Sequence, residues 1–504
     1  MIFGKTRVVW PMIGALLFFG VLWLLDFPKP SYDDLFQAGA AFHMAEGGDF
    51  SNPLIERQEF PSHYFFVYPP LNSYLLAGWL KVFGINAASV TAYPICSCMV
   101  ICVATILVLR RHQASVWLQW FVPLGVSFGI LYMGLRPEPM AVALAMTGFA
   151  ITDSEAGRKN GVIQWLGFFL MIMGASAAPR VTLFVGALVV YALYRGWRDK
   201  ATKQERWNVV FRWLGAGAAT GLLFLVMIGF RVAEFLHTFH FHAAGRISND
   251  KVWVIKQYLF GYLGYLQLTI LLMPLVLLAW VLRKPKDELS RPALWVAAMA
   301  PVAFCTGGIG SGTAWWAFLV MILLAGSLVK TLSRKGAIAL QVCIFLILVV
   351  INRKVAAECW GIVSGHITRD QGQQMAEAKA IQPTPEHPVL LDGWVARYLY
   401  DYRLPKGVID AEWSVRFPGA GPGSYATSGD AGPQLRKGDI FVVCNYMRHS
   451  LQTYTLLEKT TDPLWRAFGL KQLAFDPYPR VVYIIPAEDC KDVRPGAAQR
   501  VPGS

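Results

Sequence analysis

Charged residues are scarce in this sequence. They make up 15% of its 504 residues, whereas a soluble domain carries roughly a quarter. Hydrophobic residues make up 55% of the chain, and long apolar runs recur up to residue 352. Each run is close to the roughly 20 apolar residues that cross a bilayer as a helix. The shortage of charge excludes an ordinary soluble protein and predicts a polytopic α-helical membrane protein.

Acidic residues are the rarer kind of charge. The chain has 32 Asp and Glu against 46 Lys and Arg, which gives a formal net charge of +14. A basic patch on one face would indicate a nucleic-acid partner. Here the basic residues lie in short loops between the apolar runs, where they set the orientation of membrane helices. We therefore expect no nucleic-acid partner.

Cysteines do not form a pattern that binds metal. Cys96, Cys98 and Cys102 share one apolar run without a histidine, so we interpret them as small buried hydrophobes. Cys444 and Cys490 lie in the C-terminal part and could form a disulfide if that part is extracytoplasmic. We expect that no cofactor is required, with a divalent metal as the weaker alternative.

The apolar runs predict about eleven membrane spans. The first, Val8 to Leu25, follows Lys5 and Arg7 and lacks a cleavage site of small residues, which predicts an uncleaved span. The further predicted spans are 88–109, 115–135, 139–152, 162–178, 181–195, 209–230, 257–282, 292–309, 314–329 and 336–352.

Basic residues fall in every second loop. These basic loops are Arg110–Arg111, Arg158–Lys159, 195–206, 283–291 and 330–335. The opposite loops are 26–87, the turns at Arg136 and Arg180, 231–256, and the tail from Arg353. The positive-inside rule then places the N-terminus in the cytoplasm and the tail in the periplasm, across a bacterial inner membrane.

The apolar segment 65–84 is the one that could upset this order, because a crossing there would invert every later loop. It opens with Tyr68-Pro69-Pro70 and contains Lys81. We therefore interpret it as an interfacial or re-entrant helix rather than a span.

The chain divides into a transmembrane domain, 1–352, and a C-terminal domain, 353–504. The second part changes composition to Gly, Pro and charged residues. Short apolar strands at 389–391, 440–443 and 480–485 are separated by predicted helices at 394–403 and 450–459. This pattern predicts a small extracytoplasmic α/β domain.

The first outer loop, 26–87, is far longer than an ordinary connection, which is typical of a functional loop. Asp33 and Asp34 open a stretch in which aromatic and small residues recur at helical spacing. The acidic pair could simply favour a helix N-terminus through the macrodipole, or it could be catalytic. The spacing alone leaves both interpretations open.

The motifs of this loop resemble those of a known enzyme superfamily. Tyr32 to Gly48, followed by Asn52-Pro53 and then Tyr68-Pro69-Pro70-Leu71, is similar to the first outer loop of the GT-C membrane glycosyltransferases. The similarity is closest to the branch of protein O-mannosyltransferases and lipid A aminoarabinose transferases. It implies inverting transfer of a sugar from a polyprenyl-phosphate donor to a hydroxyl of a cell-envelope glycan, lipid or protein, outside the membrane.

The resemblance also implies roles for individual residues. A general base must take the proton of the attacking hydroxyl, and Asp33 matches that base while Asp34 matches a supporting acid. Glu138, in Arg136-Pro137-Glu138-Pro139, resembles a second acidic residue that these enzymes carry at an outer turn. Arg136 and Arg180 could bind the donor phosphate, or they could be snorkelling anchors.

Two further features concern donor or acceptor binding. His240, His242 and Arg246 lie in an outer stretch that could contact phosphate or acceptor, or have no role; the two histidines would share a face only on a strand. Tyr68 stands where some GT-C branches have a lysine that reaches the donor phosphate. Tyr68 and other groups must then hold the phosphate, or the donor differs, which argues against aminoarabinose.

Three other functions are alternatives to the transferase. A flippase or transporter of lipid-linked glycans would need ionisable groups or broken helices near the bilayer centre, and inverted repeats, whereas the polar groups here gather at the outer edge. A ligase or polymerase that uses polyprenyl-diphosphate glycans and a non-catalytic scaffold are the remaining alternatives.

Overall fold

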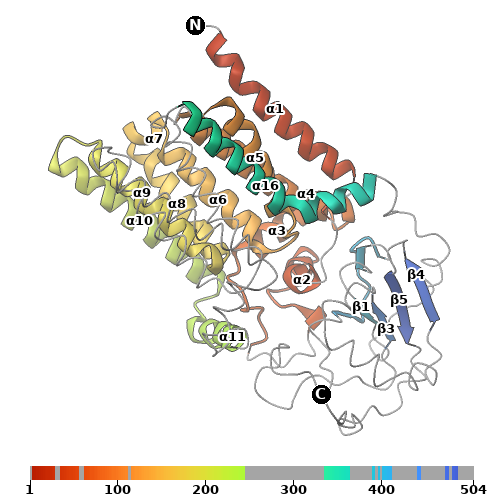
Figure 1. Ribbon diagram of the computed structural model, residues 1–504. Helices are drawn as coiled ribbons and strands as arrows, with labels where there is room; N and C mark the ends of the chain where they lie inside the picture. Colours follow the sequence, from red (N-terminus) through yellow and green to blue (C-terminus); the bar gives the residue numbers. More distant parts are fainter. Residues whose placement is uncertain are drawn as a thin grey trace, which may run out of the picture.

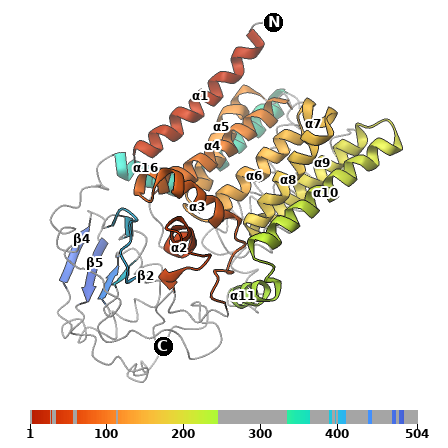
Figure 2. The same ribbon diagram turned by 180° about the vertical axis from the view of Figure 1, so that it is seen from behind.

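The computed structural model describes residues 3–25, 27–28, 34–55, 62–111, 115–244, 334–363, 389–391, 396–397, 400–410, 440–443, 471–475 and 480–485. Long helices lie side by side in one bundle, and a β-sheet lies to one side of it (Figures 1 and 2). The short helix α2 (Asp34–Ala45) lies between the bundle and the sheet in both views.

Most helices of the bundle begin and end close to the predicted spans, but the helix predicted at 336–352 continues to Val363, past Arg353, where the tail was predicted to begin. Their bounds are α1 (Phe3–Leu24), α4 (Ala87–Arg111), α5 (Val116–Leu131), α6 (Pro137–Thr152), α8 (Gly161–Ala177), α9 (Thr182–Arg198), α10 (Lys203–Met227) and α16 (Arg334–Val363). Local signals explain several starts: Pro137 opens α6, Asn160 caps α8, and Thr202 with Glu205 forms a capping box for α10. The predicted spans 257–282, 292–309 and 314–329 lie outside the described residues.

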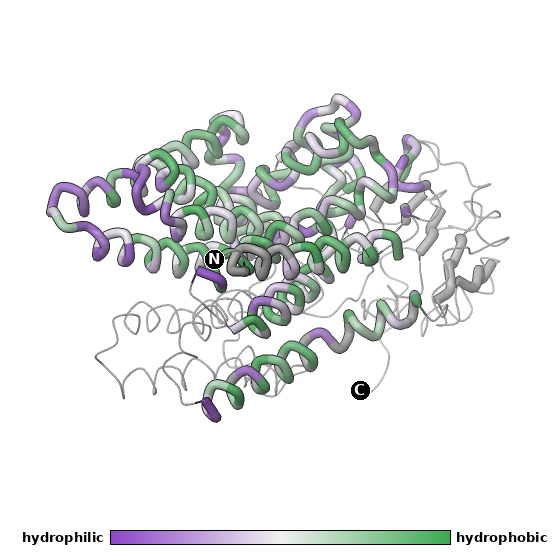
Figure 3. The backbone as a smooth tube through the Cα atoms, turned by 90° about the horizontal axis from the view of Figure 1, so that it is seen from above, coloured by the Kyte–Doolittle hydropathy of each residue, from purple (hydrophilic) through white to green (hydrophobic). Residues whose placement is uncertain are grey.

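Large apolar side chains cover the outside of the bundle. Among the described helices, α4 and α10 are long and apolar enough to cross a membrane by length and composition. Phe211 and Leu222 of α10 are 61% and 58% exposed. Hydrophobic residues run along the helices, while hydrophilic ones gather at helix ends and at the α9–α10 connection (Figure 3). An apolar surface of this extent is suited to lipid rather than water.

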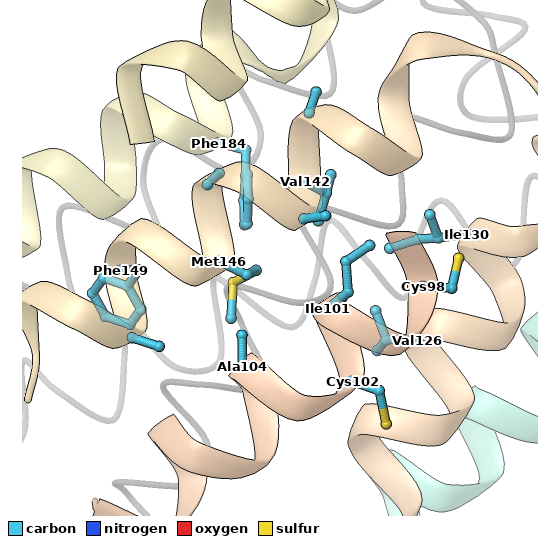
Figure 4. Packing of buried hydrophobic residues seen from close by; sticks show 14 of the residues in the cluster. Cys98, Ile101, Cys102, Ala104, Val126, Ile130, Val142, Met146, Phe149 and Phe184 are labelled. Atoms are coloured by element: carbon cyan, nitrogen blue, oxygen red, sulfur yellow. The ribbon is translucent and has the colours of Figure 1, made fainter. Parts of the chain in front are cut away.

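The interior of the bundle is apolar and closely packed. Cys98 and Cys102 of α4 lie among aliphatic and aromatic side chains of the neighbouring helices (Figure 4), as expected for small buried hydrophobes. Helices α6 and α8 approach closely through glycines. A Cβ atom on Gly148 would lie 2.6 Å from the backbone nitrogen of Met171 in α8. Small residues permit this approach, as is common between membrane helices.

One end of the bundle collects the basic loops. Arg195 Nη1 lies 2.5 Å from Asp153 Oδ1, and Arg158 pairs with Asp199 at 3.7 Å. The Arg111 side chain donates to the carbonyl of Ala150. Loops that the positive-inside rule assigns to one side of the membrane therefore meet at the C-terminal end of α6.

The opposite end carries the first outer loop. There α3 (Leu71–Phe83) has 13 residues, too few for a bilayer core of roughly 30 Å at about 1.5 Å per residue, in keeping with an interfacial element. Helix α3 packs against α2. The short helix η1 (Pro53–Ile55) follows α2 in the chain. Helix α11 (Val232–Ala244) also lies near this end (Figure 1).

The C-terminal strands form one mixed sheet. Its strands are β1 (Val389–Leu391), β2 (Val408–Asp410), β3 (Ile440–Val443), β4 (Lys471–Phe475) and β5 (Arg480–Ile485), in the order β2-β1-β3-β5-β4. β1 pairs in parallel with β2 and β3, whereas β5 is antiparallel to β3 and β4. The α/β domain as a whole stays a prediction, because the predicted helix 450–459, Cys444 and Cys490 lie outside the described residues.

Candidate active site

The site forms where α2 begins. Asp34, the first residue of α2, is 3% exposed, and a carboxylate at a helix N-terminus is stabilised by the helix dipole. Gly134, in the turn between α5 and α6, has φ +58°, and a Cβ atom there would lie 3.3 Å from Asp34 Oδ1. The turn thus touches the buried carboxylate. Asp33 itself lies outside the described residues.

The same turn leads into the predicted second acidic site. Arg136 is the N-cap residue of α6 and is half-buried. Glu138 lies in the first turn of α6 and is 3% exposed. Because Gly134 lies against Asp34, the structure brings the outer turn of Arg136 and Glu138 to the start of α2.

A tyrosine from the C-terminal tail completes this arrangement. The hydroxyl of Tyr402 donates to Asp34 Oδ2 at 3.1 Å across 368 positions of sequence. Its ring is fully buried and lies 5.7 Å from the ring of Phe42 on α2. No local pattern in the sequence pointed to this residue.

Tyr402 sits in a strained backbone. Asp401 and Tyr402 have φ values of +52° and +60°, a conformation that costs a non-glycine residue about 1–2 kcal/mol. The turn ends a helical segment: the Tyr402 N–H donates to Ala396 and the Asp401 N–H to Arg397, at 3.0 and 2.9 Å. These two bonds hold the turn at Tyr402 against residues 396 and 397. Aspartate tolerates such a φ, but tyrosine rarely adopts it.

Contacts on both sides of Tyr402 hold the turn against the bundle. Asp401 Oδ1 accepts from the N–H of Ala87, the first residue of α4, at 2.7 Å. Arg403 Nε donates to the carbonyl of Ile85 at 3.2 Å. The tail is therefore attached to the outer end of the bundle at the point where it reaches Asp34.

The Asn-Pro motif of the loop has a structural explanation. Asn52 Nδ2 donates to the carbonyl of Phe36 in α2 at 3.2 Å, and its Oδ1 accepts from the N–H of Leu54. The side chain packs against Gly39, where a Cβ atom would lie 2.6 Å from Asn52 Cγ. Asn52 thus secures the returning loop against the helix that Asp34 begins.

A second polar cluster lies at the other end of α2. Asp49 accepts from Ser51 at 2.5 Å and contacts His63 Nε2 at 2.8 Å, with His43 at 3.7 Å. The hydroxyl of Ser51 chiefly, and then His63, lower the pKa of the Asp49 carboxyl. The described residues contain no group of three or more His, Cys, Asp or Glu suited to hold a metal.

The remaining predicted residues are placed as follows. Tyr68 is half-buried, with its ring 6.2 Å from that of Phe36. Arg180 lies in η2 (Pro179–Val181), and the orientation of its side chain is not described. His240, which is exposed, and His242 both lie on helix α11, where positions two residues apart lie about 200° apart around the helix axis and share no face. Arg246 lies outside the described residues.

Gln37 is a further candidate residue, which no motif in the sequence indicates. It lies three residues after Asp34, on the same side of α2, and is 4% exposed. Its Nε2 has no hydrogen-bond partner within the described structure. An amide alone gives no sequence signal, and only the placement of α2 shows that Gln37 is buried beside the carboxylate.

Solved structures share this architecture. ArnT from Cupriavidus metallidurans bound to undecaprenyl phosphate matches with a TM-score of 0.50 and 15% identity, over 95% of this chain and 98% of that chain. Its apo state matches with a TM-score of 0.51 and 16% identity, over 96% and 99%. ArnT is a GT-C lipid A aminoarabinose transferase and a polytopic membrane protein.

The chain shares the fold of these two ArnT structures. The match covers nearly the whole chain, so it confirms the fold that the first outer loop predicted. No family model matches the sequence, and no curated protein matches it either. Within this GT-C-like fold, the start of α2 and the α5–α6 turn form the candidate active site.

Proposed function

We propose that the protein is an inverting glycosyltransferase of the bacterial inner membrane. It moves a sugar from a polyprenyl-phosphate donor to a hydroxyl of a cell-envelope glycan, lipid or protein on the extracytoplasmic side. The observation that carries this proposal is the buried acidic start of α2, held against the α5–α6 turn, in a GT-C-like fold. The undecaprenyl phosphate bound to ArnT supports the donor class.

The chemistry follows from the groups at this end of the bundle. The acceptor hydroxyl attacks the anomeric carbon, its proton passes to the Asp33 carboxylate, and the bond from that carbon to the phosphate oxygen breaks. Asp34 and Glu138 support the site. The leaving polyprenyl phosphate gains negative charge, which Arg136 and Arg180 stabilise as charged hydrogen-bond donors.

Cells that lack the protein provide the test. Their envelope glycans, lipids and proteins should include one species that is lighter by one sugar, as measured by intact mass. A polyprenyl-phosphate sugar should accumulate at the same time. If the protein were a flippase, the purified protein would not release the sugar from its lipid. Unchanged envelope masses would contradict the proposal.

The arginines give a prediction about donor binding. Arg136→Ala and Arg180→Ala should each weaken binding of undecaprenyl phosphate by about 10- to 100-fold, because a charged hydrogen bond contributes about 1.5–3 kcal/mol. Arg231→Ala is the matched control, since Arg231 pairs with Glu234 at 3.3 Å and its guanidinium lies over the ring of Tyr64. Equal affinity in all three variants would make Arg136 and Arg180 membrane anchors only.

The topology gives a second prediction. In a background without native cysteines, Glu46→Cys and Lys406→Cys should react with a membrane-impermeant thiol reagent on intact cells, because both positions are exposed at the outer end. Ala201→Cys, in the exposed basic α9–α10 connection, should react only after lysis. Labelling of only one of the first two positions would mean that the first outer loop and the tail lie on opposite sides of the membrane, which would contradict an extracytoplasmic active site.

A further inference from the structure

We propose that Tyr402 is a positioning residue for the acidic pair, so that the C-terminal tail is a working part of the active site. This inference rests on the proposed function. A buried hydroxyl reaches a buried carboxylate at 3.1 Å, and Asp34 directly follows the predicted base Asp33. The bond fixes Asp34 at the start of α2, the residue that follows Asp33 in the chain.

The backbone of the turn supports this role over simple packing. Two successive residues hold left-handed φ values, and such strain persists where surrounding contacts over-determine it and is concentrated at functional sites. A tyrosine that only filled space beside Phe42 would not require a strained backbone. The strained turn directs the Tyr402 hydroxyl to Asp34, while the side chains of Asp401 and Arg403 bind the chain at Ala87 and Ile85.

The residues on either side of Tyr402 hold its side chain in this position. Asp401 binds the first N–H of α4, and Arg403 binds the Ile85 carbonyl just before that helix. Three consecutive side chains thus make three hydrogen bonds to the outer loop. The turn at 401–403 is thus fixed at Ile85 and at the start of α4, on either side of Tyr402.

The first arm of the test removes only the hydroxyl. Tyr402→Phe should lower kcat about 10-fold with little change in KM for the donor, because a hydrogen bond to a charged group is lost while the ring stays. Tyr400→Phe is the matched control: Tyr400 is half-buried two residues away in the same segment, and its variant should match the wild type. The substrates are a panel of undecaprenyl-phosphate-linked hexoses and pentoses with a cell-envelope extract as acceptor.

The second arm asks whether Tyr402 acts through Asp34. Asp34→Ala combined with Tyr402→Phe should lose no more activity than Asp34→Ala alone, because alanine already removes the acceptor of the Tyr402 hydrogen bond, and residues that act as one unit are not additive. Losses that multiply would overturn the inference, because Tyr402 would then act independently of the carboxylate.

A third arm does not depend on changing Tyr402. Asp401→Ala should lower kcat as Tyr402→Phe does, whereas Asp401→Asn should restore it, because asparagine keeps an acceptor oxygen and tolerates the left-handed φ. If Tyr402→Phe fails to fold, the Asp401→Ala and Asp401→Asn variants test the positioning role. An active wild type with Tyr402→Phe equal to Tyr400→Phe, or with Asp401→Ala equal to wild type, refutes the positioning role alone. A wild type inactive on every donor refutes the proposed function and this inference with it.

Discussion

Replacing Asp33 with asparagine is expected to abolish sugar transfer while the protein stays folded and still binds a polyprenyl phosphate. The change keeps the shape of the side chain and removes only its ability to accept a proton. Loss of a general base typically costs about 10²–10⁴ in rate. Turnover of the undecaprenyl-phosphate sugar panel, with undecaprenyl phosphate affinity measured on the same preparations, checks this result.

Asp34→Asn is the companion variant and should cost less. Its buried carboxylate accepts from Tyr402, and an asparagine oxygen can still accept that hydrogen bond, so geometry is largely kept. Small and equal losses for the two variants would end the catalytic interpretation of the pair. The acidic residues would then serve only the N-terminus of α2.

Gly148→Val is expected to separate α6 from α8 and to lower stability strongly. A side chain on Gly148 of α6 would meet the backbone of α8 at Met171, 2.6 Å from its nitrogen, and backbone cannot rotate away as a side chain can. The two helices must separate, and overpacking of this kind costs about 3 kcal/mol. Because α6 carries Arg136 and Glu138 at its outer end, activity should fall together with thermal stability in detergent.

Gly221→Val is the control for that change. Gly221 lies in α10 and is exposed, and nothing within 4 Å would meet its new Cβ atom. Valine has a slightly higher helix propensity than glycine, so stability should be unchanged within about 0.5 kcal/mol. Equal melting temperatures for the two variants would mean that α6 and α8 do not pack as closely as described.

Much of the helical architecture could be predicted because it is encoded locally. The bounds of α4 lie within about two residues of the span predicted from its apolar run. The prolines before Leu71 correctly indicated the start of a short helix, α3. The joint placement of Asp34 with the turn of Arg136 and Glu138 followed from the charge pattern of the loops and the family resemblance.

The long-range contacts could not be predicted, because no periodicity links residues far apart in sequence. Tyr402 and Asp34 are 368 positions apart, and nothing near Tyr402 marks it as different from Tyr400. The conformation of α11 was also open, since two histidines at positions 240 and 242 fit either a strand or a helix. Only the packed structure shows them on different faces.

Release of undecaprenyl phosphate by the purified protein tests the account most directly. The protein is reconstituted in liposomes with each undecaprenyl-phosphate-linked sugar and a cell-envelope extract, and the anomeric configuration of the product is read by NMR. The account predicts release that depends on the acceptor, with inversion at the anomeric carbon and loss of activity in Asp33→Asn. Release that is equally fast in Asp33→Asn, or a product with retained configuration, would contradict it.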